Sequence, residues 1–195
     1  MISAIYGVIL SKFTNQEKFF LSYPVDMRPV GFKNVTGCFV NNLLLKIDLK
    51  DHSLFSELLR NISGQRRVTN KYQGYSMTHI INDQRKLRGG LEANHFNVGI
   101  TQANLNTLPF TLNNLDVSSI DITASREIHD ELTLLYDEYS SNQLKFKLSC
   151  EKELFSEGFI IKFKEAFVRL IDDLLESEYL DIKQYSSIPS IEQGV

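Results

Sequence analysis

The sequence lacks the features that would assign it at once to a membrane or nucleic-acid-binding class. No apolar run is long enough to span a bilayer, and the apolar stretch 1–10 has neither the basic residues nor the small-residue cleavage site of a signal peptide. The net charge of −3 is opposite in sign to the basic surface that nucleic-acid binding requires. We therefore expect neither a membrane nor a nucleic acid among the partners.

Cysteine and clustered histidine are also scarce. The two cysteines, Cys38 and Cys150, form no Cys-x-x-Cys pair, and the four histidines show no His-x-His or His-Glu-x-x-His spacing. A metal site is not expected, and so few cysteines suit a reducing cytosol, which predicts a cytoplasmic protein. Cys38 is interpreted as a small core side chain on a strand and not as a nucleophile.

What is present is the composition of a globular domain. With 195 residues, 43% of them hydrophobic and 23% charged, the chain can bury a proper core. We predict a single domain over 1–182 and a polar tail or linker over 183–195. The stretches 65–67 and 85–88 are small basic clusters, for which a solvated surface is the favoured interpretation and contact with an acidic protein or a phosphate is the functional alternative.

Periodicity predicts an α/β fold, with a mixed, mostly antiparallel sheet and helices on one face. Alternation of apolar and polar residues indicates strands, and apolar residues three or four apart indicate helices. Ser53 and Ser156 are the expected N-caps of two of these helices. The predicted helices are 2–13, 54–62, 75–87 and the segment after 156, and the predicted strands are 18–23, 38–49, 96–101, 116–122 and a hairpin within 128–150.

One polar residue interrupts the apolar face of the strand 38–49. Asn41 lies between Phe39 and Leu43 in the period of two, with the rest of that face apolar. A buried amide without partners costs about 1–3 kcal/mol, so this one should be bonded to backbone, water or a ligand. Asn41 is therefore a candidate for fixing or reading something in a cleft.

The stretch Thr36–Leu45, read TGCFVNNLLL, resembles the G-x-F-V-N-T motif of the condensation domains of nonribosomal peptide synthetases. Asn41 stands at the motif's Asn, and Asn42 replaces the usual Thr or Ser. Tyr72–Met77 departs from the family's H-Q-D-x-P-F, and the S-R-N-P segment is not recognisable around 84–90. Five further pieces match in family order: Leu10–Gln16, Ser22–Arg28, Phe96–Gln102, Glu131–Leu134 and Leu154–Phe155 with the helix after it.

This resemblance implies a fold and a set of site residues. The family has the chloramphenicol acetyltransferase-like fold, in which two similar lobes enclose a tunnel, and it joins an acyl group to an amine, each tethered to a carrier protein by a phosphopantetheine arm. By resemblance, Asn41 would lie near the tunnel and Arg28 could pair with a carboxylate, for example one of another lobe. Gly37 and Gly99 could allow a close approach of the arm, although bends in the sheet would explain both glycines as well.

The family's H-H-x-x-x-D-G motif is absent, since no two histidines are adjacent. The match therefore predicts a C-terminal lobe that supplies tunnel wall and a docking surface for a peptidyl or aryl carrier protein, with no catalytic residue or directly bound cofactor of its own. The phosphopantetheine arm of the carrier would be the substrate tether. Partners would be the missing N-terminal lobe or another synthetase subunit, with self-association as a further option.

Two alternatives remain open. The chain could be a non-catalytic module that binds a carrier protein or synthetase subunit, or an independent acyltransferase with an unrecognised base. A natural split protein, a remnant and an excised piece would all fit the sequence.

Overall fold

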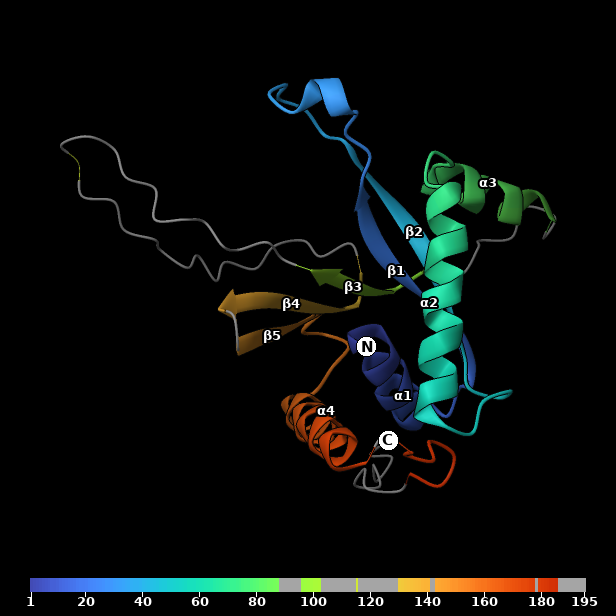
Figure 1. Ribbon diagram of the computed structural model, residues 1–195, viewed down its shortest axis with the longest axis vertical. Helices are drawn as coiled ribbons and strands as arrows, with labels where there is room; N and C mark the ends of the chain where they lie inside the picture. Colours follow the sequence, from blue (N-terminus) through green and yellow to red (C-terminus); the bar gives the residue numbers. More distant parts are fainter. Residues whose placement is uncertain (88–95, 103–114, 116–129, 141–142, 178, 186–195) are drawn as a thin grey trace.

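A five-stranded mixed sheet organises the chain. This computed structural model describes residues 1–87, 96–102, 115, 130–140, 143–177 and 179–185. The strands are β1 (Lys18–Asp26), β2 (Val40–Asp48), β3 (Val98–Gln102), β4 (Leu132–Ser140) and β5 (Gln143–Cys150), in the spatial order β2-β1-β3-β4-β5 (Figure 1). The two outer pairs, β1 with β2 and β4 with β5, are antiparallel, whereas β3 runs parallel to both neighbours. The predicted α/β class with a mixed sheet is confirmed.

Three helices cover one face of this sheet. They are α1 (Ile2–Thr14), α2 (Phe55–Lys71) and α4 (Glu157–Glu176), while α3 (Met77–Leu87) lies beyond the end of α2 (Figure 1). Every residue from Ser3 to Ser11 is buried, as expected of a helix that is apolar on nearly all sides. An added Cβ at Gly7 would lie 3.0 Å from Ile47 Cγ2, so the missing side chain lets α1 approach the sheet closely.

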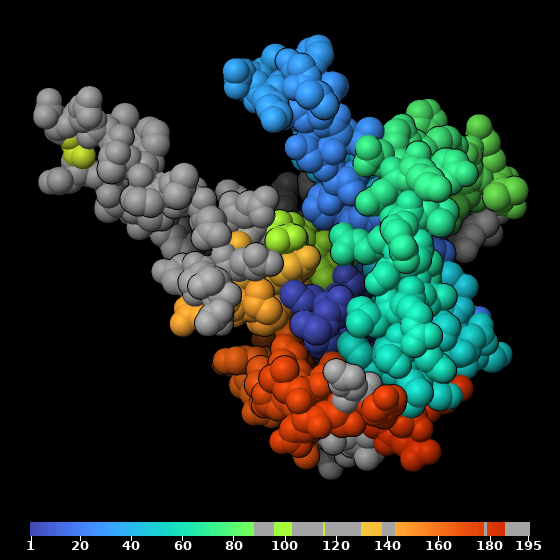
Figure 2. All heavy atoms as spheres, viewed as in Figure 1, coloured from blue at the N-terminus to red at the C-terminus, as the bar shows by residue number. Residues whose placement is uncertain are grey.

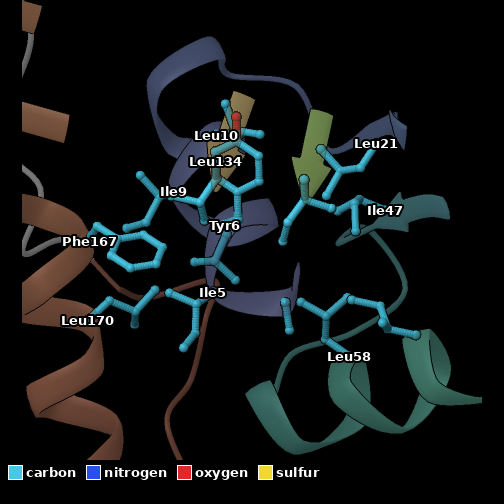
Figure 3. Packing of buried hydrophobic residues seen from close by; sticks show 14 of the residues in the cluster. Ile5, Tyr6, Ile9, Leu10, Leu21, Ile47, Leu58, Leu134, Phe167 and Leu170 are labelled. Atoms are coloured by element: carbon cyan, nitrogen blue, oxygen red, sulfur yellow. The ribbon is translucent and has the colours of Figure 1, made fainter. Parts of the chain in front are cut away.

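The core forms where the inward side chains of the strands meet α1. Figure 3 shows Tyr6 and Ile9 of α1 between residues from β1, β2, β4 and α4. Leu43, Leu45 and Ile47, which alternate along β2, are buried, and this confirms the predicted face of the strand. The Tyr6 hydroxyl donates a hydrogen bond to the carbonyl oxygen of Leu132 (3.4 Å), and burial raises the pKa of that phenol far above its usual value.

The predicted hairpin and last helix are confirmed. Leu134 pairs with Leu148 across β4 and β5, which puts the expected apolar residues on one face. Ser156 caps α4, because its Oγ accepts a hydrogen bond from the backbone N–H of Phe159 (3.2 Å). The strand expected over 116–122 lies outside the described residues.

The helix predicted over 54–62 is α2, and both its length and its cap differ from the prediction. The helix continues to Lys71, and its N-cap residue is Leu54 and not Ser53. The Glu57 carboxylate caps the first turn, since it accepts from the N–H groups of Ser53 (3.1 Å) and Leu54 (3.2 Å). The predicted serine side chain is thus replaced by a carboxylate that reaches back from the first turn.

Cys38 is exposed, so its interpretation as a core side chain was wrong. The residue precedes β2, in the loop that joins β1 to β2, and therefore lies outside the packed part of the strand. Cys150 at the end of β5 is half-buried, and both cysteines are free thiols.

The loop between β1 and β2 projects from the rest of the molecule. It spans 27–39 and contains the short 3-10 helix η1 (Val30–Phe32), and Figures 1 and 2 show it standing clear of the helices. Several of its apolar side chains are open to solvent, Val30 being 90% exposed, and Val40 at the start of β2 is 59% exposed. Exposed apolar groups on a projecting loop are typical of a surface that meets another protein.

The segment 180–185 packs on the core. Ile182 and Tyr185 are buried, the Ile182 N–H donates to the Ser53 carbonyl (2.9 Å), and the Tyr185 hydroxyl donates to Asp173 Oδ2 (2.8 Å). Packing thus continues three residues past the boundary predicted after 182, and the assignment of the tail stays a prediction. No helix of the described residues is long and apolar enough to cross a bilayer.

Candidate functional site

Asn41 fastens β2 to the turn between α2 and α3. Its Nδ2 donates to the carbonyl oxygens of Gln73 (2.7 Å) and Tyr75 (3.0 Å), and its Oδ1 accepts from the N–H of Met77 (3.4 Å). All three partners belong to Tyr72–Met77, the segment that departs from the family's H-Q-D-x-P-F. The amide predicted to be bonded to backbone, water or a ligand is therefore bonded to backbone, and it fixes the position of the turn before α3.

That segment presents a small polar cluster at the start of α3. The Ser76 Oγ accepts from the His79 N–H (3.3 Å), which is the geometry of a helix cap, and the same oxygen lies 2.7 Å from His79 Nδ1. The Tyr75 hydroxyl donates to Asp83 Oδ2, and this hydrogen bond raises the pKa of the tyrosine. The centres of the Tyr75 and His79 rings are 5.5 Å apart. The serine–histidine contact is sufficiently explained as a helix cap.

Arg28 organises the projecting loop. Its guanidinium donates to the carbonyl oxygens of Phe32 (3.2 Å) and Gly37 (3.3 Å), and to that of Val35, and it lies 4.2 Å from the centre of the Phe39 ring. These contacts hold both ends of the loop in one geometry. No described carboxylate forms an ion pair with this guanidinium, so its pairing with a carboxylate of another lobe stays a prediction.

The two glycines have different surroundings. An added Cβ at Gly37 would lie 3.2 Å from the Phe39 ring, within the same loop. At Gly99 an added Cβ would be 2.2 Å from Asp130 Oδ2, a contact that no side chain could make. The carboxylate occupies this space and accepts a hydrogen bond from the Ser22 hydroxyl (3.3 Å). Gly99 thus makes room for an interaction within the sheet, and its predicted contact with a substrate arm stays untested.

A further cluster is not recognisable in the sequence. Arg66 of α2 lies with its guanidinium carbon 4.9 Å from the centre of the Tyr23 ring, and the Tyr23 hydroxyl donates to Asn70 Oδ1 (3.1 Å). The sequence indicates Arg66 only as part of a basic stretch. Tyr23 is 43 positions earlier in the chain, and no spacing rule links the two.

The remaining histidines add no site. His52 lies in the turn before α2, and His95 and His129 lie outside the described residues. No group of three or more His, Cys, Asp or Glu side chains in the described part of the chain is arranged to hold a metal ion. Of the two histidines that the structure describes, only His79 lies beside the residues that Asn41 holds.

Comparison with known proteins assigns the family. The family model "Condensation domain" matches residues 1–194. Relatives include a plipastatin synthase subunit of Bacillus subtilis (strain 168), 24% identical over 198 residues that cover 99% of this chain and 8% of the relative. Surfactin synthase subunit 2 of the same organism is 26% identical over 174 residues, covering 88% of this chain and 5% of the relative. The chain thus spans a small fraction of the relatives it matches.

Solved structures agree on the fold. The starter condensation domain of rhizomide synthetase superposes with a TM-score of 0.67 at 14% identity, over 97% of this chain and 44% of that one. A four-domain nonribosomal peptide synthetase superposes with a TM-score of 0.80 at 18% identity, over 97% of this chain and 16% of that one. This chain spans less than half of a solved condensation domain. The protein belongs to the condensation-domain family of nonribosomal peptide synthetases.

Proposed function

We propose that this chain acts as the C-terminal lobe of a condensation domain. It supplies one wall of the tunnel and a surface on which peptidyl or aryl carrier proteins dock, and a segment bearing H-H-x-x-x-D-G supplies the general base for amide-bond formation. The proposal is supported by a family match over residues 1–194 together with coverage of only 44% of a solved condensation domain. The absence of adjacent histidines in the sequence points the same way. Both substrates would arrive on phosphopantetheine arms.

The observation that carries this proposal is the position of Asn41. It joins the strand that resembles G-x-F-V-N-T to the turn within Tyr72–Met77, through hydrogen bonds of 2.7–3.4 Å. A motif-like strand and a turn that lie 31 positions apart, counted from Asn41 to Tyr72, are thus held together by one side chain. We assign Asn41 the role of a positioning residue that holds the turn against the tunnel, with Arg28, Gly37 and Gly99 as further substrate-side candidates.

A second candidate function is a non-catalytic module that binds a carrier protein or another synthetase subunit. The projecting loop 27–39 favours it, because Arg28 stiffens a loop whose apolar tip is open to solvent, with Val30 90% exposed. A surface organised in advance loses less conformational entropy on binding. In this case the loop would serve association without chemistry.

Reconstitution separates the candidates. The chain would be mixed with an N-terminal lobe bearing H-H-x-x-x-D-G and with loaded donor and acceptor carriers, and the amide product followed by mass spectrometry. We expect no product from the chain alone, product from the two lobes together, and none when the second His of that motif is replaced by Ala, since a general base contributes roughly 10²–10⁴-fold.

Each other outcome points to an alternative. Carrier binding without product, although both lobes bind each other and are folded, would identify an interaction module. Product from the chain alone that disappears in His79→Ala would instead identify an independent acyltransferase. Asn42→Ala is the control for Asn41→Ala, because Asn42 is exposed on the other face of β2 and its loss should leave folding unchanged.

A further inference from the structure

Three polar side chains from α2 and β1 converge near Asn41. The Arg66 guanidinium carbon is 4.9 Å from the Tyr23 ring centre, and the Tyr23 hydroxyl donates to Asn70 Oδ1 over 3.1 Å. Arg66 and Asn70 are four residues apart on α2 and so project from the same side of the helix. Tyr23 is 3% exposed, which gives this group a rigid base in the sheet.

The cluster retains donors for a ligand. Stacking on an aromatic ring engages the face of a guanidinium, whose five N–H groups lie in its plane. Among the described residues no carboxylate lies within ion-pair distance of Arg66. Because Asn70 accepts through Oδ1, its amide NH₂ is also available to donate. The cluster therefore offers a positive charge and two kinds of N–H donor.

The charge of Arg66 affects the pKa of the Tyr23 phenol. Burial raises the pKa of the Tyr23 phenol, and the positive charge of Arg66 together with a side-chain hydrogen bond from it opposes this rise. One such hydrogen bond leaves most of the five guanidinium N–H groups for a ligand. The phenol is therefore held neutral at physiological pH, and it does not neutralise the guanidinium beside it. The charge of Arg66 stays available to an anion.

Helix stabilisation does not require this arrangement. A cation near a helix C-terminus is favourable, and Arg67 and Lys71 already supply positive charge in the last turns of α2. The Arg67 side chain lies along its own helix, where its Nε donates a hydrogen bond to the Ser63 carbonyl oxygen (3.4 Å). Arg66 is directed across to the sheet instead. Adjacent arginines on one helix thus have different environments.

The cluster is adjacent to the residues that resemble the family motif. Val25 pairs with Asn41 in the sheet, and Tyr23 precedes Val25 by two residues on the same face of β1, which is about 7 Å along the strand. The cluster therefore lies about two residues along the sheet from Asn41, whose side chain holds the turn before α3.

The face of α2 toward the sheet changes character along the helix. Its first part is buried through Phe55, Leu58 and Ile62, whereas its last part meets the sheet through Arg66 and Asn70. A few convergent polar groups at the end of an otherwise apolar interface are typical of the place where a charged ligand is accommodated.

We propose that Arg66, Tyr23 and Asn70 form a binding site for an anionic oxygen group, a phosphate or a carboxylate. Arg66 donates to two of its oxygens, Asn70 donates to one, and Tyr23 holds the guanidinium in place. Two sources fit this chemistry: the phosphate of a pantetheine arm, and a carboxylate on the tethered acyl or aminoacyl group. The link to a tethered substrate rests on the proposed function, whereas anion binding by the chain does not.

The direct test is titration of the whole 195-residue chain at constant ionic strength, followed by NMR. The signals observed are the Arg66 Nε–H and the Asn70 side-chain NH₂. The probes are 4′-phosphopantetheine, pantetheine without the phosphate, inorganic phosphate and propionate. We expect saturable shifts with the anionic probes and none with pantetheine. Stronger binding of 4′-phosphopantetheine than propionate identifies the arm as the source, and the reverse order identifies a substrate carboxylate.

The variants make the assignment specific. Arg66→Gln should weaken anion binding by about tenfold or more, as expected for loss of a charge-assisted bidentate contact. Arg67→Gln removes the same charge one residue away and should leave binding within about twofold. Equal weakening by both variants would show diffuse attraction by the basic stretch and overturn the site, as would pantetheine binding as tightly as 4′-phosphopantetheine. Thermal unfolding of both variants verifies that each is folded.

Reconstituted condensation tests the link to substrate separately. If the two lobes form product, Arg66→Gln should raise KM for the loaded carrier and leave kcat largely unchanged, while Arg67→Gln behaves as the unsubstituted chain. Identical kinetics of the two variants would refute the link to substrate and leave the proposed function intact. Anion binding by the chain without any condensation would refute the proposed function and leave the site intact.

Discussion

Replacing Asn41 by Ala tests how the motif strand is coupled to the turn before α3. The substitution removes two donated hydrogen bonds and one accepted one. The bond to the Tyr75 carbonyl lies at the surface, where water can replace it, whereas the bond to the Gln73 carbonyl is partly buried. A stranded buried acceptor costs about 1–3 kcal/mol, and partial access of water to both carbonyls reduces this to about 1–2 kcal/mol.

The assay is thermal unfolding followed by far-UV circular dichroism, with Asn42→Ala as the control. For a chain of this size each kcal/mol shifts Tm by about 2–4 °C, so the loss corresponds to a Tm lower by about 2–8 °C. Amide exchange at Met77 should also accelerate, because its N–H loses Asn41 Oδ1 as acceptor. An unchanged Tm together with unchanged exchange would refute the reasoning from these contacts.

The same variant tests the role of Asn41 in function. A residue that only contacts substrate would leave the free energy of unfolding unchanged and lower the activity of the reconstituted two-lobe enzyme. The hydrogen bonds lead us to expect a moderate loss of stability. A loss of substrate positioning is expected only if the proposed function holds. Normal activity per folded molecule, with a lower Tm, would make Asn41 purely structural.

Three further predictions concern stability and association. Asp48 is 6% exposed and its hydrogen bond from Lys46, together with Lys18, lowers its pKa from 3.8 to about 2. The ionised carboxylate therefore stabilises the fold at pH values above its unfolded-state pKa. In urea unfolding, Asp48→Asn should lower the free energy of unfolding at neutral pH, and this difference should disappear as the pH falls through about 4 to 2. A difference that is independent of pH would contradict this. Arg28→Ala should accelerate amide exchange in the loop 27–39 while Tm changes little, since the loop projects from the core; an equal change throughout the lobe would count against it. Val168, 49% exposed on α4 and seven residues from exposed Ile161, should belong to any self-association surface, so Val168→Glu should lower the mass seen by light scattering, and a monomeric parent chain would refute it.

The elements that follow from local pattern were predictable. α4 has buried Phe163, Phe167 and Leu170 at three- and four-residue spacing with a serine cap before them, and both signals are local. The predicted helix 54–62 is too short because the second half of α2 is polar, and this half meets the sheet through Tyr23 instead of through an apolar stripe. Local pattern carries little information about a helix whose partners are polar and distant in sequence.

The candidate site was predictable only in part. The apolar alternation around Asn41 identified it as a residue that must be bonded, but its partners are backbone atoms of Gln73, Tyr75 and Met77, which any sequence would present. Arg28 illustrates the same limit, because its acceptors are carbonyl oxygens of its own loop. A backbone atom can accept or donate a hydrogen bond whatever its residue type, so the sequence does not reveal which residues are partners. Such contacts form much of this site.

The central position of α1 has a consequence for how the chain folds. Ser3–Ser11 are all buried, against strands and against Phe163 of α4, more than 140 residues later in the sequence. During synthesis this apolar helix emerges well before the segments that cover it, and contacts between such distant residues form slowly. The nascent chain therefore carries an apolar helix that is only partly covered until α4 is made, and we expect its folding yield to depend on chaperones or a partner present at the ribosome. Moving α1 to the C-terminus by circular permutation, after residue 185, should shorten this interval and raise the soluble yield.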